Sequence, residues 1–243
     1  KKVNIPQVSR WGELSIVKTQ DELDYLFKLH KVFLKMQDFD YRIESPWISV
    51  YTNNKADIDK LSKVAMDGKI SLRETLKFRV SYLKGKSTQL IKRIIKKIRF
   101  SEGSKVLLRT LNKNGYHSNL VTGGFHPIST HVGKILGFKK IISNKFIIKK
   151  NKFTGEYIPI TGKQNSKLFY LNYICKKKRL DKIKHAISVG DGANDLGMLK
   201  NSGLGIGYRP HHIIEKAVDN HIRFTDLTTI LFYLGFTEKE FSK

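Results

Sequence analysis

Residues 188–195, with the sequence SVGDGAND, combine two carboxylates, an amide and two glycines within eight positions. We expect a strand to end here, then a sharp turn that the glycines permit, and then a helix beginning near Asn194. The carboxylates of Asp191 and Asp195 on so tight a loop suit a hard cation such as Mg²⁺, which takes a few protein oxygens together with phosphate and water. A turn with helix-capping acids is the alternative interpretation. The complete string favours the cation site.

Two further segments could hold the phosphate group of a substrate. Residues 121–125 read VTGGF, and the hydroxyl of Thr122 and the backbone N–H of Gly123 at the end of a strand can bind phosphate oxygens. Such Thr-Gly-Gly segments are also common turns. Lys167 begins a helix between this segment and residues 188–195, where its cation could neutralise phosphate and restrain a carboxylate nucleophile.

Asp38 and Asp40 follow the apolar run of residues 31–36, which is typical of a buried strand. Two carboxylates at positions i and i+2 project differently from the end of a strand. One can therefore attack phosphorus as a nucleophile while the other handles protons. In isolation, such a pair is more typical of a solvated loop.

The elements that would position these residues alternate between strands and helices from Ser101 onward. Such alternation predicts an α/β protein with a doubly wound parallel sheet, in which ligands bind at the carboxyl ends of the strands. The loops at residues 38–40, 122–124 and 190–195 are therefore expected to gather at one edge. We expect strands at residues 118–121, 141–148, 156–160, 186–189 and 204–208, and helices at residues 21–29, 56–100, 128–136, 166–179 and 194–201 and in a segment that ends at 114–115.

Composition sets outer limits on the function. The chain of 243 residues has a net charge of +25 and one cysteine, Cys175. One cysteine excludes an internal disulfide and multi-cysteine metal sites, and it suits a reducing compartment, so we expect a cytoplasmic location. No run of about eighteen apolar residues occurs, so no transmembrane helix is expected. Because lysines are abundant everywhere, we attribute the charge to composition, and we expect neither nucleic acid nor a membrane as a partner.

The order of these segments resembles the haloacid dehalogenase superfamily, and within it the bacterial phosphoserine phosphatases. Residues 190–195 are similar to the fourth motif of the superfamily, and residues 121–125 are similar to its second motif, which is usually Ser-Gly-Gly in those phosphatases. The resemblance covers about residues 32–241 and is specific from Val64 onward. Further matching segments are residues 65–70, 79–80 and 83–85 in a helical cap, Asn144 with residues 153–155 in a β-ribbon, and residues 226–231 and 235–236 near the end.

This resemblance implies a Rossmann-like haloacid dehalogenase core with a small helical cap domain. The expected domains are a remnant of an N-terminal region at residues 1–30, the first core strand and nucleophile loop at residues 31–44, the helical cap at residues 45–100, and the α/β core at residues 101–243. The sequence leaves the oligomeric state open, with a homodimer among the options.

The resemblance also implies Mg²⁺-dependent hydrolysis of a small phosphorylated metabolite, O-phosphoserine, as the last step of serine biosynthesis. Asp38 would attack phosphorus and form an aspartyl-phosphate, while Asp40 would protonate the leaving oxygen and then activate water. The metal would be held by Asp38, Asp191 and the backbone carbonyl of Asp40, with Asp195 in support. The residues implied to bind phosphate or the rest of the substrate are Thr122, Gly123, Lys167, Asn194, Arg79, Met66 and Glu44.

The first motif departs from the family pattern, which is Asp-x-Asp-Ser-Thr. Tyr41 and Arg42 follow Asp40 here, so a bulky ring and a fixed cation replace two small hydroxyls beside the nucleophile. Another registration places residues 49–52, SVYT, at this motif and leaves no nucleophile. Two alternatives to phosphoserine hydrolysis therefore stay open: a catalytically inactive homologue, and a phosphatase or phosphotransferase acting on another small phosphomonoester.

Overall fold

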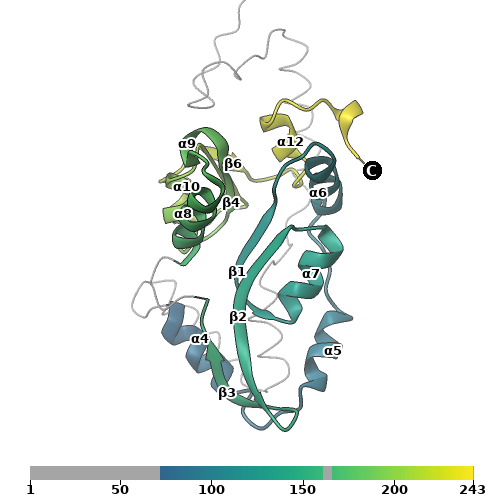
Figure 1. The fold of residues 1–243 in the computed structure, drawn as a ribbon, viewed down its shortest axis with the longest axis vertical. Coiled ribbons are helices and arrows are strands. Elements are labelled where there is room, and N and C mark those ends of the chain that lie inside the picture. Colours follow the sequence, from purple (N-terminus) through teal and green to yellow (C-terminus); the bar gives the residue numbers. More distant parts are fainter. Residues whose placement is uncertain (1–71, 161–165, 243) are drawn as a thin grey trace, which may run out of the picture. The chain divides into compact units, whose positions relative to one another are not determined.

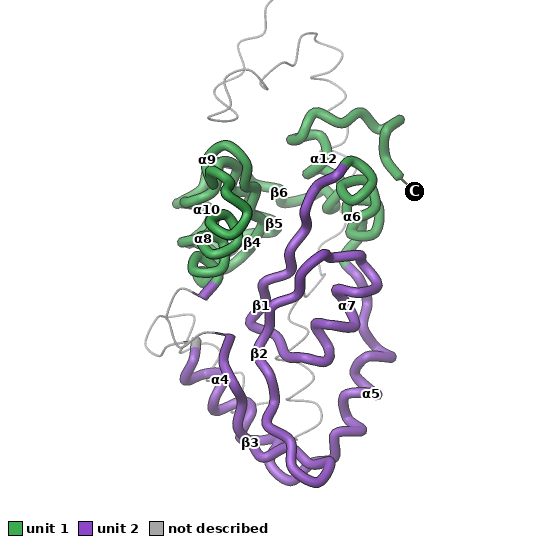
Figure 2. Tube along the Cα trace, in the orientation of Figure 1, with its two compact units in different colours: residues 1–39, 101–114, 167–243 green, residues 40–100, 115–166 purple. Residues whose placement is uncertain are grey.

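The computed structural model describes residues 72–160 and 166–242. The chain divides into two compact units (Figure 2). Unit 1 comprises Lys1–Phe39, Ser101–Asn114 and Lys167–Lys243, and unit 2 comprises Asp40–Phe100 and Gly115–Ser166. Each unit has its own three-stranded sheet (Figure 1). The four domains expected from the sequence stay a prediction.

Unit 2 is built around a parallel crossover that joins two strands through a helix. Strand β1 pairs with β2 in parallel, α7 lies between them in the chain and packs against both, and β2 continues into an antiparallel hairpin with β3. The helix α4 packs against β3, and α5 packs against α7. The bounds are α4 (Leu72–Ser81), α5 (Gln89–Ile95), β1 (Asn119–His126), α7 (Ile128–Leu136), β2 (Lys140–Lys149) and β3 (Lys152–Ile158).

Strand β1 differs from the expected strand at residues 118–121 followed by a turn. It continues through residues 122–124 to His126, and its register with β2 shifts between Val121 and Phe125. The hydroxyl of Thr122 accepts a hydrogen bond from the N–H of Gly124 at 3.0 Å, so the chain makes a local bend within the strand. The segment is therefore an irregularity inside a strand rather than the end of one.

The core of unit 2 combines aromatic rings from the sheet with aliphatic residues from the helices. Phe125 on β1 stacks on Phe146 on β2 with ring centroids 4.2 Å apart, and Phe153 on β3 meets Phe146 edge-on at 5.0 Å. The helical segment expected over residues 56–100 is interrupted between α4 and α5. Leu90, Ile91 and Ile94 of α5 are buried in this core.

Unit 1 contains a parallel sheet in the order β4-β5-β6, with α10 packed against β4 and β5. Parallel strands alternating with helices confirm the predicted α/β class. Gly205 on β5 lies directly beneath the carbonyl of Leu199, where any side chain would overlap the backbone of α10. The bounds are α6 (Ser104–Lys113), α8 (Ser166–Lys178), α9 (Lys182–His185), β4 (Ile187–Gly190), α10 (Leu196–Lys200), β5 (Leu204–Tyr208), α11 (His212–Glu215), β6 (Asn220–Ile222), α12 (Thr229–Tyr233) and the 3₁₀ helix η1 (Glu238–Glu240).

Helix termination follows the expected signals. The helix α6 ends at Lys113, and Gly115 just beyond it adopts a φ of 78°, a left-handed conformation that suits glycine. Within residues 72–160 and 166–242, no helix is both long enough and apolar enough to cross a membrane.

Candidate functional site

The loop from β4 to α10 is held together by the carboxylate of Asp195. Its Oδ2 atom accepts hydrogen bonds from the backbone N–H groups of Asp191, at 3.2 Å, and Gly192, at 3.3 Å. The N–H of Asp195 donates in turn to the carbonyl of Gly192 at 2.8 Å. The loop therefore folds back on a side chain only four residues further along the chain.

The other oxygen of Asp195 binds a cation from α8. The ammonium nitrogen Nζ of Lys167 lies 2.6 Å from Oδ1, and the side chains of Lys167 and Asp195 are 14% and 1% exposed. A carboxylate so deeply buried requires compensation, which the lysine and the two N–H donors supply together. Lys167 and Asp195, both predicted to belong to the site, are thus in direct contact.

Glycine at position 190 makes room for this carboxylate. A side chain on Gly190 would overlap the Cβ and Cγ atoms of Asp195. The glycine is thus required by close packing inside the loop, beyond the sharp turn that the sequence suggested.

Asp191 is held from a second direction by the segment after β5. Its carbonyl accepts a hydrogen bond from the N–H of His211 at 2.8 Å. Arg209, two residues earlier, has a φ of 45° and donates its N–H to the carbonyl of Ile222 on β6 at 2.7 Å. Burial raises the pKa of the neighbouring Tyr208 hydroxyl, with Arg209 acting in the opposite direction. The ends of the neighbouring strands β4 and β5 are therefore linked through Asp191.

Sequence reasoning did not select His211 or the residues around it. The available signal was the position of this segment after a predicted strand, since the carboxyl ends of parallel strands meet at one edge of a sheet.

The remaining predicted residue of the loop, Asn194, is exposed, while Asp191 is half-buried.

The predicted phosphate-binding residues Thr122 and Gly123 lie in the irregular part of β1, in unit 2. The carbonyl of Gly123 accepts a hydrogen bond from the side-chain amide of Asn144 on β2, and Asn144 is 4% exposed. The same side chain accepts a hydrogen bond from the N–H of Ile160 at 2.8 Å. Asn144, noted in the sequence as part of the β-ribbon, thus fixes the backbone at the second motif.

Arg79 lies in the last turn of α4 and is half-buried. The predicted residues Asp38, Asp40, Glu44 and Met66 lie outside the described part of the chain. Among residues 72–160 and 166–242, no group of three or more His, Cys, Asp or Glu side chains could hold a metal ion. The structure thus brings together Lys167, Asp191 and Asp195 in unit 1, whereas Thr122, Gly123 and Arg79 belong to unit 2.

A family model of haloacid dehalogenase-like hydrolases matches residues 47–200 of the chain. This protein belongs to the haloacid dehalogenase-like hydrolases. The family predicted from the motifs is therefore confirmed.

Two curated relatives are similar over most of their length. The phosphoserine phosphatase of Methanocaldococcus jannaschii is 33% identical over 178 residues, which cover 73% of this chain and 84% of that protein. The phosphoserine phosphatase of Lactococcus lactis subsp. lactis is 31% identical over 176 residues, covering 71% of this chain and 81% of the relative.

Two solved structures of phosphoserine phosphatase show the same fold. A substrate-bound phosphoserine phosphatase complex matches with a TM-score of 0.72 at 32% identity, covering 77% of this chain and 89% of that one. A phospho-aspartyl intermediate analogue of phosphoserine phosphatase matches with a TM-score of 0.71 over the same shares of the two chains. The predicted Rossmann-like α/β fold is confirmed by these matches.

Proposed function

We propose that the chain is a magnesium-dependent phosphoserine phosphatase that hydrolyses O-phosphoserine to serine and phosphate. The observation that carries this proposal is the 2.6 Å contact between Lys167 and Asp195, because it joins the two predicted phosphate- and metal-site segments of unit 1. The similarity to phosphoserine phosphatases over more than two thirds of their length supports the same substrate.

The donor set of the β4–α10 loop fits a magnesium ion. Mg²⁺ takes oxygen ligands and is usually held by one or two carboxylates together with substrate phosphate and water. Asp191 offers a half-buried carboxylate on a loop whose backbone is held by Asp195 and His211. We propose that Asp191 holds the ion together with Asp38 and the carbonyl of Asp40, both outside the described residues. When bound, the ion would offset the repulsion between an anionic nucleophile and a phosphate ester.

Asp195 acts, in this proposal, by positioning its neighbours. Its two oxygens already accept hydrogen bonds from Lys167, Asp191 and Gly192, so its carboxylate sets the place of the lysine and the shape of the loop. An ammonium group has three N–H donors, and Asp195 takes one. Lys167 therefore keeps the capacity to bind phosphate oxygens as charge develops on them.

The other predicted residues have proposed roles of their own. The hydroxyl of Thr122 and the N–H of Gly123 would bind phosphate oxygens, and the planar guanidinium of Arg79 would meet the carboxylate of the serine moiety. Asn194 would help to orient the substrate. Asp38 would be the nucleophile and Asp40 the acid and base, with Met66 and Glu44 contacting the rest of the substrate from the cap.

A second candidate function is favoured by the sequence of the first motif. Tyr41 and Arg42 stand where the family usually has two small hydroxyl residues. Arg42 would place a fixed positive charge beside the nucleophile and compete for its carboxylate. The second candidate is thus a homologue that keeps the fold and has lost hydrolysis.

The test is phosphate release from O-phosphoserine by the purified full chain. We expect activity that EDTA removes and added Mg²⁺ restores, and that Asp38→Asn abolishes. Asp59→Asn is the control, because it makes the same substitution at a carboxylate to which no role is assigned, and it should stay active. A folded wild type that releases phosphate from no phosphomonoester supports the inactive homologue. Faster phosphate release from another phosphomonoester would identify that ester, in place of O-phosphoserine, as the substrate.

A further inference from the structure

The two units carry equal numbers of cations but differ in acidic residues: each has 23 lysines and arginines, whereas unit 2 has 7 aspartates and glutamates and unit 1 has 14. Its described residues include seventeen lysines and arginines but only two acidic residues, Glu74 and Glu156. The described residues of unit 1 include fifteen lysines and arginines and nine aspartates and glutamates. A lysine-rich composition accounts for the cations of both units, but not for the scarcity of acidic side chains in the described part of unit 2. The difference between them indicates that unit 2 carries a surface of its own.

One part of this surface is α5 with the turn that follows it. Lys92, Arg93, Lys96, Lys97 and Arg99 are all exposed. The large apolar residues of the helix, by contrast, are turned into the core of unit 2. The outer side of α5 therefore presents cations with no exposed large hydrophobic side chain among them.

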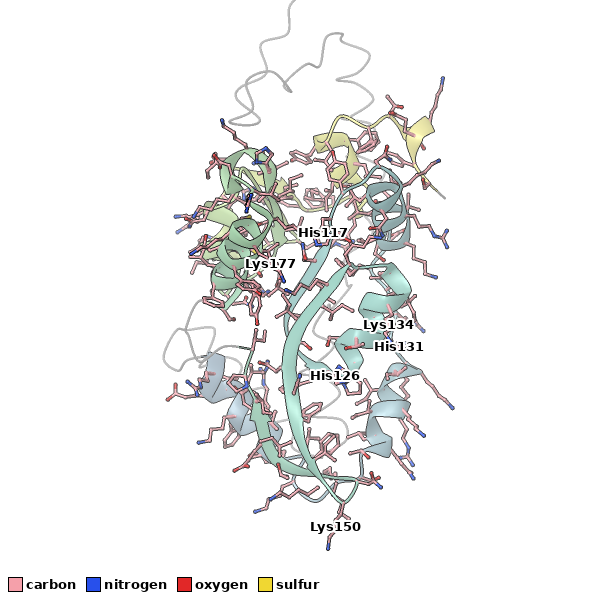
Figure 3. All side chains as sticks on the ribbon, in the orientation of Figure 1. His117, His126, His131, Lys134, Lys150 and Lys177 are labelled. Atoms are coloured by element: carbon pink, nitrogen blue, oxygen red, sulfur yellow. The ribbon has the colours of Figure 1, made fainter. Side chains whose placement is uncertain are left out.

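The other part is the tip of the β2–β3 hairpin. Lys149, Lys150 and Lys152 are exposed, and Figure 3 labels Lys150 at the end of the ribbon. Lys150 and Asn151 have φ values of 46° and 58°. Two-residue hairpin turns of this hand usually contain Asn-Gly, because a lysine in the left-handed region is strained. A lysine at this position thus puts a cation at the tip in spite of a conformational cost.

Backbone hydrogen bonds tie the tip of the hairpin to the segment just before α5. The N–H of Thr88, just before α5, donates to the carbonyl of Asn151 at 2.9 Å. The N–H of Phe153 donates to the carbonyl of Lys86 at 3.0 Å, and Ser87 forms a bridge with Lys152. We call the two parts together the basic surface; it consists of Lys92, Arg93, Lys96, Lys97, Arg99, Lys149, Lys150 and Lys152.

We propose that the basic surface binds the sugar-phosphate backbone of a nucleic acid, independently of the proposed phosphatase activity. Five cations lie between Lys92 and Arg99, at the end of α5 and in the turn that follows it. One strand of a duplex carries a phosphate about every 3.4 Å along its axis, so cations this closely spaced in the chain suit such an array. Contacts to the backbone position a nucleic acid without reading its bases, so little sequence preference is expected.

A bilayer fits the basic surface less well. Stable binding at a membrane surface generally needs several apolar side chains that enter the acyl region in addition to cations. The apolar side of α5 is buried in the core, and Ile148, beside Lys149 and 43% exposed, supplies one isoleucine. Pairing with a second copy through the same surface would bring like charges together. A regular array of phosphates needs only the cations that the surface presents.

The experiment compares two triple variants of the full chain by fluorescence anisotropy with a 20-base-pair DNA duplex. Lys92→Gln, Arg93→Gln and Lys96→Gln neutralise three cations of the basic surface. Lys176→Gln, Lys177→Gln and Lys178→Gln remove the same charge from exposed positions of α8 in unit 1. We expect log K of the wild type to fall linearly with log of the salt concentration. The first variant should flatten that slope by about 2.7, at about 0.9 for each phosphate that is no longer neutralised, and the control should leave it unchanged.

Three outcomes would overturn the proposal. Equal weakening by both variants would mean diffuse attraction by net charge. No binding of the wild type to the DNA duplex at 50 mM salt would exclude the site. Binding to phosphatidylserine vesicles without binding to duplex or single-stranded DNA would assign the surface to a membrane. A tip variant, Lys149→Gln with Lys150→Asn, keeps the test valid if the helix variant misfolds, because asparagine tolerates the left-handed turn. Circular dichroism reports on folding in each case.

Discussion

At the scale of single residues, Asp195 concentrates several functions in one carboxylate. It is almost completely buried, it receives an ammonium group and two backbone N–H groups, and it fills the space that glycine leaves at position 190. In such a setting, removal of one partner is costly because the other polar groups lose their compensation and have no water to replace it.

We predict that Asp195→Ala lowers the free energy of unfolding by about 3 kcal/mol, because it leaves the Lys167 ammonium and two N–H groups without their acceptor. Urea denaturation measures the change. The matched control is Glu215→Ala, which breaks the more exposed ion pair of Glu215 with Arg223 at 3.2 Å and should cost about 1 kcal/mol or less.

The double variant Asp195→Ala with Lys167→Met tests the cause of this loss. Once Lys167→Met has removed the cation, Asp195→Ala no longer leaves an ammonium group without a partner. The combined loss should therefore be smaller than the sum of the two single losses. Strict additivity would contradict a direct interaction between the two side chains.

At the scale of elements, the start of α9 shows how a short helix is held by its first residue. Asp181 precedes the helix, and its Oδ1 atom accepts hydrogen bonds from the N–H groups of Ile183, at 2.8 Å, and Lys184, at 3.4 Å. The hydrogen bond from Ile183 is the main reason that the pKa of Asp181 is lowered from its ordinary value of 3.8. The ionised form is therefore the one that caps the helix well.

A pH dependence follows from the direction of this shift. A carboxyl group whose pKa is lower in the folded state stabilises the fold above its unfolded pKa, and this stabilisation is lost as the pH falls through the folded pKa. We predict that Asp181→Ala lowers the melting temperature at pH 7, and that its difference from the wild type shrinks below about pH 3.8. Thermal unfolding followed by circular dichroism measures this, and a difference that does not vary with pH would contradict the capping role.

The hairpin of unit 2 depends on its aromatic residues. Phe146 on β2 stacks on Phe125 and meets Phe153 edge-on, so it joins all three strands of that sheet. We predict that Phe146→Ala lowers the free energy of unfolding by about 3–5 kcal/mol, through reduced burial and the cavity that remains. Phe169→Ala on α8 is a control, since its ring is 38% exposed and its removal should cost much less. Urea denaturation of both variants measures the two losses, and equal losses would contradict a special role for Phe146.

At the scale of the whole molecule, a net charge of +25 acts against the folded state. Like charges held on a compact surface repel one another more strongly than in the extended chain. Salt screens this repulsion, because the Debye length falls from about 10 Å at 0.1 M to about 3 Å at 1 M.

We therefore predict that sodium chloride raises the melting temperature between 0.05 M and 0.5 M. Differential scanning fluorimetry at neutral pH measures it. A melting temperature that falls with salt would show that attractive ion pairs outweigh the repulsion. The basic-surface variant, with three fewer cations in unit 2, should show a smaller rise than the wild type.

The sequence by itself determined most of the local structure. Hydrophobic periodicity and glycine placement predicted α7 and β5 at their observed bounds and α6 and α8 within a residue of their observed ends. These features depend on neighbours within a few residues, and local pattern reports on such neighbours directly. The order of the motifs also led to the family, because chemistry demands the same residue types at the same loops.

Tertiary structure decided what depends on contacts between distant residues. That Asp195 receives Lys167, 28 positions away, and that His211 supports Asp191 are consequences of packing between separate elements. The same holds for residues 122–124, where pairing with β2 continues the strand past a segment that reads as a turn. The connection between the two groups of cations in unit 2 was also hidden in the sequence. The sequence gives the position of each charge along the chain, whereas folding pairs the hairpin tip with the segment just before α5, residues 86–88.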